Sequence, residues 1–126
     1  MNDYFFDTYA LHEISQKGEN YAAFVSDVGI VTTKLNLMEL YYSYVAKDEL
    51  ETAERLFERF RQFCVNVDDD TLKKAMRVRA RLKRDRKGSN FSYVDCIGYV
   101  MAKKLKVKFL TGDREFEGLD NVEFVK

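Results

Sequence analysis

The chain has no proline, only two cysteines and only one histidine in its 126 residues. It also has no low-complexity stretch and no internal repeat, so nothing marks a linker and we expect a single domain over residues 1–126. The cysteines, Cys64 and Cys96, lack the spacing of a zinc site and are expected to be free thiols in a reducing cytoplasm. His12 has no histidine or cysteine partner, which argues against zinc binding and against acid–base catalysis by a pair of histidines.

Long apolar runs are missing as well, because charged residues interrupt them every few positions. No segment is therefore expected to span a membrane, and the first residues lack the basic start of a secretory signal. None of the six glycines falls into a GxGxxG or GxxxxGK pattern, which disfavours nucleotide binding. Asp7-Thr8-Tyr9 is not the Asp-x-Asp of haloacid dehalogenase-type phosphatases. We therefore expect a cytoplasmic protein that is neither a nucleotide-binding protein nor a phosphatase of this type.

Charge is abundant and unevenly distributed. Residues 1–63 carry 6 basic and 11 acidic side chains, whereas residues 64–126 carry 15 basic and 10 acidic ones. The basic excess lies between Lys73 and Lys87. Lysine and arginine on such a helix and loop can contact nucleic-acid phosphates, or they can pair with the acidic helix between Glu49 and Glu58. The residues that would contact phosphates are Arg77, Arg81, Arg84, Arg86 and Lys87.

Short β-branched or aromatic segments alternate with helical patterns along the chain. We expect strands over 4–6, 29–31, 65–67, 107–110 and 122–125, and helices between them, including one over 20–27. This alternation predicts an α/β fold with a parallel sheet covered on both faces.

Several acidic residues stand where a functional role and a structural one both fit. Asp7 and Asp113 follow expected strands, where parallel sheets place their sites, but aspartate also caps helices and turns. Asp95 lies in the first turn of an apolar helix, where Ser92-x-x-Asp95 also fits a shortened capping box. Asp68-Asp69-Asp70 precedes a helix and is expected to cap it rather than to bind metal.

Glu39 is harder to explain structurally. It lies in the middle of an almost wholly apolar helix over 34–46, where an unpaired carboxylate would cost several kcal/mol. Asn36 and Ser43 extend a narrow polar stripe along the same helix. This stripe must face a partner charge, a metal ion or a solvated edge.

Four segments with these acids resemble, in order, the PIN-domain ribonucleases, and in particular the VapC-type toxins of toxin–antitoxin pairs. The matching segments are Tyr4-Phe5-Phe6-Asp7-Thr8, Leu37-Met38-Glu39-Leu40, Ser92-Tyr93-Val94-Asp95 and Leu110-Thr111-Gly112-Asp113-Arg114-Glu115-Phe116. Gly98 departs from the family pattern, which more often has an alanine-rich helix there. Together these segments span nearly the whole chain.

The resemblance implies an α/β/α sandwich with a five-stranded parallel sheet. It also implies that Asp7, Glu39, Asp95 and Asp113 bind metal at one edge of the sheet, with the Thr111 hydroxyl as support. We expect Thr8 and Asn36 to support the same site. Converging carboxylates require a compensating cation, and oxygen ligands suit Mg²⁺ or Mn²⁺. The function expected is a metal-dependent endoribonuclease, with RNA as substrate and an antitoxin protein as partner, and with a possible homodimer.

Two other functions remain open. One is a housekeeping RNA-processing nuclease of the same fold, which the sequence does not separate from a toxin. The other is a non-catalytic module that binds RNA or protein, against which the presence of all four acids argues.

Overall fold

The computed structural model describes residues 2–26 and 28–126. Within them, four parallel strands form one sheet in the order β2-β1-β3-β4. The strands are β1 (Asn2–Phe6), β2 (Val28–Val31), β3 (Lys108–Thr111) and β4 (Val122–Phe124). The α-helices are α1 (Thr8–Ser15), α2 (Ala23–Ser26), α3 (Lys34–Val45), α4 (Leu50–Phe60), α5 (Asp69–Asp85) and α6 (Tyr93–Lys104). Three short 3-10 helices are η1 (Glu19–Tyr21), η2 (Arg61–Phe63) and η3 (Arg114–Phe116).

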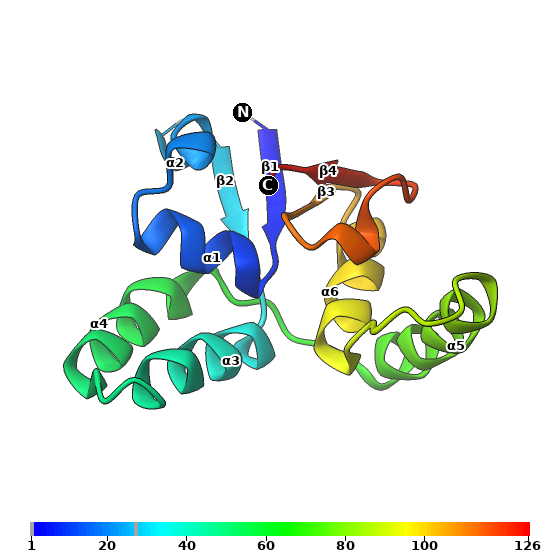
Figure 1. The fold of residues 1–126 in the computed structure, drawn as a ribbon, viewed down its shortest axis with the longest axis horizontal. Coiled ribbons are helices and arrows are strands. Elements are labelled where there is room, and N and C mark those ends of the chain that lie inside the picture. Colours follow the sequence, from blue (N-terminus) through cyan, green and yellow to red (C-terminus); the bar gives the residue numbers. More distant parts are fainter. Residues whose placement is uncertain (1, 27) are drawn as a thin grey trace.

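The central strand β1 shows why the sheet is covered on both faces. Successive side chains of a strand point to opposite faces, and the adjacent Phe5 and Phe6 are both fully buried. Phe5 belongs to the core formed with α5 and α6, whereas Phe6 belongs to the core formed with α1, α3 and α4. Figure 1 shows these two groups of helices on either side of the sheet. The predicted α/β/α sandwich with a parallel sheet is confirmed.

The predicted fifth strand over 65–67 does not form. Thr32 donates its backbone N–H to Phe63 O (3.1 Å) and accepts from Val65 N–H (2.9 Å), which makes one parallel bridge between Thr32 and Cys64. After this bridge the chain leaves the sheet edge and enters the cap of α5. The segment is apolar enough for a strand, but it runs beside β2 for too short a distance.

The single helix expected over 20–27 does not form as predicted. It is replaced by η1 and the short α2, and Asp27 lies outside the described residues. Tyr21 is the buried residue of this region and packs with Tyr9 and Phe24.

Gly98 allows α6 to approach the sheet closely. A Cβ atom at this position would lie 2.7 Å from Cε1 of Phe5 and 3.1 Å from Cε1 of Phe109. Both rings are fully buried, so neither has space to move away. The glycine that departs from the family pattern therefore brings the start of α6, and Asp95 with it, close to β1 and β3.

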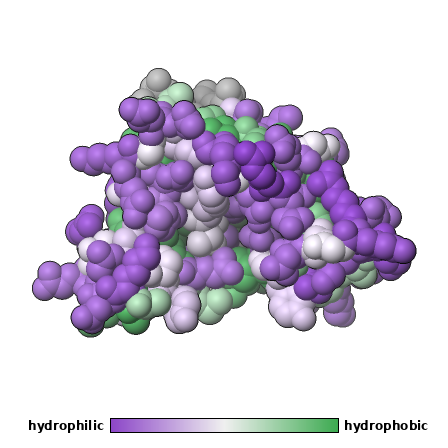
Figure 2. All heavy atoms as spheres, viewed as in Figure 1, coloured by the Kyte–Doolittle hydropathy of each residue, from purple (hydrophilic) through white to green (hydrophobic). Residues whose placement is uncertain are grey.

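Both cysteines are free thiols, as predicted, and burial raises the pKa of Cys96 to about 11. Among the described residues, no helix is both long enough and apolar enough to cross a membrane. Hydrophilic side chains cover most of the face shown in Figure 2, especially over α4 and α5.

Candidate active site

The site begins at the edge of the sheet where β1 and β3 end. These strands are parallel neighbours in register, with Phe6 beside Leu110, and the Asp7 backbone N–H donates to Leu110 O at 3.3 Å. Asp7 directly follows β1, and Asp113 follows β3 by two residues. The carboxyl ends of adjacent parallel strands lie at one edge, so two acids far apart in the sequence come close together.

Asp7 combines a structural role with unusual burial. Its carboxylate oxygen Oδ1 accepts the N–H of Ala10 at 2.8 Å and thereby caps α1. The residue is only 1% exposed, which is rare for an acid without a basic partner. The capping explanation considered from the sequence is correct, but it accounts for one carboxylate oxygen only.

Asp113 is held by the turn that follows β3. Its backbone N–H donates to the buried Thr111 hydroxyl at 3.0 Å, and its carboxylate accepts the N–H of Glu115 at 3.0 Å, which caps η3. The Thr111 side chain also acts on Asp7, whose pKa it lowers. Thr111 is therefore a neighbour of both acids.

Asp95 comes from the first turn of α6. Its backbone N–H donates to the Ser92 hydroxyl at 3.0 Å, which is the cap of this helix. The prediction that Ser92 caps this helix is thus correct. Asp95 itself is half-buried beside the sheet edge.

Glu39 is connected to the start of α1 by a chain of polar side chains. Thr8 donates its hydroxyl to Glu39 Oε1 at 2.6 Å and accepts from Asn36 Nδ2 at 3.2 Å. The Asn36 carbonyl oxygen in turn accepts the Thr33 hydroxyl at 2.7 Å. Asn36 is fully buried, so the polar stripe predicted on this helix faces inward at Asn36. Ser43, by contrast, donates to the backbone of its own helix at Leu40.

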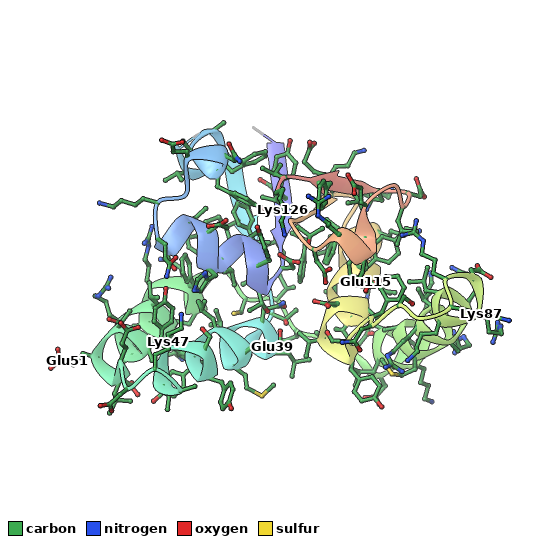
Figure 3. All side chains as sticks on the ribbon, viewed as in Figure 1. Glu39, Lys47, Glu51, Lys87, Glu115 and Lys126 are labelled. Carbon is green, nitrogen blue, oxygen red and sulfur yellow. The ribbon has the colours of Figure 1, made fainter. Side chains whose placement is uncertain are left out.

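Three of the four predicted acids line one small pocket. Asp7, Asp95 and Asp113 surround a space of about 350 Å³ together with other residues of the sheet edge and the chain end. Glu39 is not in its lining, but its negative charge raises the pKa of Asp95. Figure 3 shows Glu39 on α3 and Lys126 at the chain end, both in the central region of the molecule. The remaining lining residues are Tyr9, Gly112, Arg114 and Lys126.

Burial and mutual repulsion raise the pKa of the acids in this pocket. Burial, the largest cause, raises the pKa of Asp7 to about 8, and the charges of Asp95 and Asp113 add to it, while hydrogen bonds from Thr111 and Ala10 act in the opposite direction. Burial likewise raises the pKa of Asp95 to about 6, with added repulsion from Glu39 and Asp113. No ion pair between the described residues neutralises Asp7, Asp95 or Asp113.

These features fit a divalent cation. The donors are carboxylate and hydroxyl oxygens, which hard ions such as Mg²⁺ and Mn²⁺ prefer, and the clustered acids have no compensating positive charge at bonding distance. Within residues 2–26 and 28–126, however, no three acidic, histidine or cysteine side chains already have the arrangement of a metal site. The acids share a pocket without converging on one point.

Other acids have structural roles, as the sequence predicts. Asp68 caps α5 by accepting the N–H of Thr71 at 2.8 Å, and its second oxygen pairs with Lys104 at 2.7 Å. These hydrogen bonds hold the pKa of Asp68 well below its usual range. His12 stacks on Tyr44, with ring centroids 5.5 Å apart.

The basic helix α5 is exposed on the side away from α6. Arg77, Arg81 and Arg84 are exposed, whereas Arg86 donates to the backbone oxygens of Glu115 (2.9 Å) and Glu117 (3.2 Å). Arg86 thus ties the loop after α5 to the segment after Asp113. Among the described residues, no ion pair joins α5 to the acidic α4, and Figure 1 shows the two helices at opposite ends of the molecule.

Three pocket residues were not predicted as site residues: Tyr9, Arg114 and Lys126. Arg114 could have been found because it directly follows Asp113. Tyr9 looks like an ordinary aromatic residue of an amphipathic helix. Lys126 is distant in sequence from every predicted acid, so only the folded chain brings it to them.

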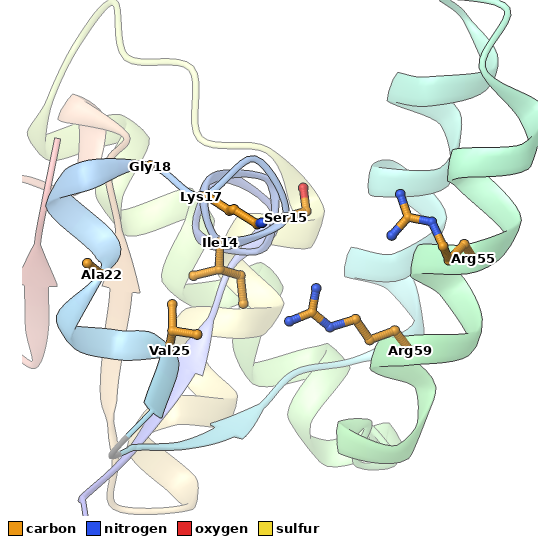
Figure 4. A pocket seen from close by; sticks show the side chains of 8 residues that line it. All are labelled: Ile14, Ser15, Lys17, Gly18, Ala22, Val25, Arg55 and Arg59. Atoms are coloured by element: carbon orange, nitrogen blue, oxygen red, sulfur yellow. The ribbon is translucent and has the colours of Figure 1, made fainter.

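A separate pocket of about 560 Å³ lies between the end of α1, the α2 region and α4 (Figure 4). Arg55 and Arg59 point into it from α4, and its floor includes Ile14 and Val25. It has no carboxylate in its lining and therefore none of the groups that the chemistry of the acidic pocket requires.

Solved structures with this architecture cover nearly the whole chain. The sarcin–ricin-loop-cleaving toxin VapC20 of Mycobacterium tuberculosis matches with a TM-score of 0.76 at 16% identity, covering 98% of this chain and 99% of that one. A DNA-bound VapBC of Salmonella typhimurium matches with a TM-score of 0.71 at 22% identity, covering 98% and 97%. A toxin–antitoxin complex of Klebsiella pneumoniae gives a TM-score of 0.72 at 15% identity, covering 94% of each chain. At these identities, the similarity establishes a shared fold.

No curated protein matches the sequence significantly. The family model described as PIN domain matches residues 4–122, which include all four acids predicted from the sequence. The family match agrees with the order of the acid-bearing segments and with the α/β/α sandwich. The chain belongs to the PIN-domain family.

Proposed function

We propose that this chain is a metal-dependent endoribonuclease with its active site at the acidic pocket. The observation that carries the proposal is the joint lining of one small pocket by Asp7, Asp95 and Asp113, which come from three separate segments of the chain. A fully buried acid beside two half-buried ones, with no ion-pair partner among the described residues, costs stability, and such clusters are typical of functional sites.

The groups that would hold Mg²⁺ or Mn²⁺ are the carboxylates of Asp7, Glu39, Asp95 and Asp113. When bound, such an ion supplies an activated water and neutralises charge on the scissile phosphate. Metal binding and protonation compete, because the raised pKa of Asp7 means that this carboxyl holds a proton at neutral pH when no cation is present.

The surrounding hydroxyls and amides would position these acids. Thr8 and Asn36 direct Glu39 toward the start of α1. Thr111 accepts the backbone N–H of Asp113 and lowers the pKa of Asp7. Such supporting hydrogen bonds restrict the rotamers of metal ligands and are expected to matter for activity.

The exposed face of α5 is our candidate for contacts to the RNA backbone. Arg77, Arg81, Arg84 and the loop residue Lys87 are all exposed and would give salt-dependent, sequence-tolerant binding. Arg86 is a weaker candidate than the other four, because its guanidinium already donates to two backbone oxygens.

Several structures with this fold are described as toxin–antitoxin complexes, and one is described as a toxin that cleaves the sarcin–ricin loop. We therefore propose that this chain is the toxin of such a pair, with RNA as its substrate, an antitoxin protein as its partner and a homodimer as a possible assembly. Its free thiols suit a reducing cytoplasm.

The decisive experiment is RNA cleavage in Mg²⁺ and in EDTA with four variants. Asp7→Asn and Asp95→Asn are expected to lower the rate by about a hundredfold or more, because each removes a charged ligand. Asp69→Asn and Asp70→Asn are matched controls, since these exposed acids begin α5 outside the pocket, and they are expected to cleave at the normal rate.

Cleavage that survives both Asp7→Asn and Asp95→Asn would contradict the assigned site. Calorimetry without detectable Mg²⁺ binding would favour the non-catalytic module. Growth arrest on expression, relieved by the product of an adjacent small gene, separates a toxin from a housekeeping nuclease.

A further inference from the structure

Lys126 is a basic side chain in the wall of the acidic pocket. It lines the pocket together with Asp7, Asp95 and Asp113, and its ammonium group lies 5.3 Å from the centroid of the Tyr9 ring. Figure 3 shows this residue in the centre of the molecule, in front of β1. It is thus a cation at the place where a nuclease must accept a polyanion.

The backbone of this segment is held at three points. Val125 donates its N–H to Thr111 O at 2.8 Å, and Val125 O accepts the Tyr21 hydroxyl at 2.6 Å. The backbone oxygen of Lys126 accepts from Asn20 Nδ2 at 2.8 Å. These bonds join β3 and η1 to the last residues, so the fold determines the backbone position of Lys126.

Tyr9 forms the surface over which the ammonium lies. A Cβ atom on Gly112 would lie 2.1 Å from Tyr9 Cε1, so the absence of a side chain at Gly112 allows this ring to pack on the backbone between Thr111 and Asp113. The negative face of a tyrosine ring attracts an ammonium that lies above it. Gly112 and Tyr9 together hold the Lys126 side chain beside the acids.

The Lys126 ammonium forms no ion pair with the part of the chain that the structure describes. Within the described residues, no carboxylate lies within 4.0 Å of its ammonium, whereas Arg114, the other basic residue of the pocket, pairs with Glu117 at 3.6 Å. Lys126 is also exposed and can reach a ligand without any rearrangement of the core.

We propose that Lys126 binds a backbone phosphate of the RNA substrate at the mouth of the acidic pocket, with its side chain oriented by Tyr9. This inference rests on the proposed nuclease function and extends it to substrate binding. An ammonium is a point-charge ligand for phosphate and offsets the repulsion between the RNA and the acids. The site is distinct from the basic face of α5.

The test compares Lys126→Gln and Lys126→Arg with the wild type. The matched control is Lys103→Gln, because Lys103 also lies over a tyrosine ring (Tyr99, 4.6 Å) but pairs with Asp120 and is outside the pocket. The probe is a fluorescent single-stranded RNA of mixed sequence, whose binding is measured in EDTA over a range of salt concentrations. Cleavage is then measured in Mg²⁺, and thermal unfolding verifies that each variant is folded.

We expect Lys126→Gln to weaken RNA binding about 3- to 10-fold and to reduce the salt slope of binding by about 0.7, as the loss of one phosphate contact requires. KM is expected to rise by a similar factor, while kcat stays within about twofold. Lys126→Arg should retain most of the binding, and Lys103→Gln should behave as the wild type.

Unchanged RNA affinity and salt slope in Lys126→Gln, with wild-type protein that cleaves RNA, would overturn this inference and leave the proposed function intact. Tighter Mg²⁺ binding in Lys126→Gln without weaker RNA binding would also overturn it, since Lys126 would then only balance the charge of the acids. Wild-type protein that neither binds nor cleaves RNA would overturn both proposals.

Discussion

Asp7 is the residue in which structure and chemistry are most closely combined. One carboxylate oxygen caps α1, and the side chain is almost entirely removed from water beside Asp95 and Asp113. The cap stabilises the start of the helix, whereas the buried charge opposes folding unless a proton or a cation compensates it.

The pH dependence of stability follows from this conflict. The pKa of Asp7 is raised to about 8 in the folded chain, against 3.8 for the free group. Between these values the folded state holds a proton that the unfolded state has lost, so in EDTA the free energy of unfolding should fall as pH rises from about 4 to 8. Asp7→Asn still caps α1 and should lose less stability over this range, with a difference on the order of a few kcal/mol at pH 8.

Thermal or denaturant unfolding at several pH values in EDTA measures this effect. Asp69→Asn, which changes an exposed acid, serves as the reference for a charge change without burial. Parallel stability profiles for the wild type and Asp7→Asn would show that Asp7 ionises normally in the folded protein.

Glu39 shows how far a single residue can be interpreted from the sequence. Its place in an apolar helix predicts that it needs a polar partner, and Asn36 one turn earlier was predicted to share its stripe. The partner itself, Thr8, belongs to another helix and donates to Glu39. The sequence around Glu39 therefore predicts that this residue needs a polar partner. The packing of α1 against α3 supplies that partner, the Thr8 hydroxyl.

At the scale of elements, α6 joins a cap, an acid and a close packing contact within a few residues. Ser92 begins the helix by accepting the N–H of Asp95, and Gly98 allows the helix to lie against Phe5 and Phe109. The cap orients the first turn and the glycine determines how near that turn lies to the sheet. Both therefore influence where the Asp95 carboxylate lies.

Substitution of Ser92 tests this role. Ser92→Ala should lower the free energy of unfolding by about 1 kcal/mol because the Asp95 N–H loses its acceptor. Ser92→Thr keeps a hydroxyl and should lose less. RNA cleavage should fall in Ser92→Ala, but by less than in Asp95→Asn, since the carboxylate remains. Urea unfolding and initial cleavage rates provide the two measurements, and an alanine variant as stable as the wild type would contradict the capping role.

At the scale of the whole molecule, the acidic pocket is a product of the parallel sheet. Strands β1 and β3 end at the same edge, and α6 packs across them to bring Asp95 to the same place. A cation in this pocket would contact residues from distant parts of the chain, and these residues come together only in the folded state. Cation binding is therefore expected to raise the free energy of unfolding of the whole domain.

Mg²⁺ should accordingly raise the Tm of the wild-type chain at pH 7 to 8. At a free concentration 100 times the Kd, the gain is about 2.7 kcal/mol, which corresponds to an increase of about 10 °C for a domain of this size. Asp7→Asn and Asp95→Asn should show a much smaller increase, and Asp70→Asn a normal one. Differential scanning calorimetry with Mg²⁺ and with EDTA distinguishes these cases; equal shifts in all four proteins would place the ion elsewhere.

The sequence by itself determined the sandwich, the four candidate acids and the capping role of Asp68, because hydrophobic periodicity, helix caps and the order of short motifs depend on neighbouring residues. Only the tertiary structure decided that β4 is the last of four strands, that Arg86 binds backbone oxygens and that Lys126 lies over Tyr9. These features depend on where separate segments meet, and that is determined by packing such as that of the Phe5 and Phe109 rings against Gly98 of α6. The sequence predicts the four acids as a set; the fold brings Asp7, Asp95 and Asp113 into one pocket, with Glu39 beside it, and adds the lysine at its mouth.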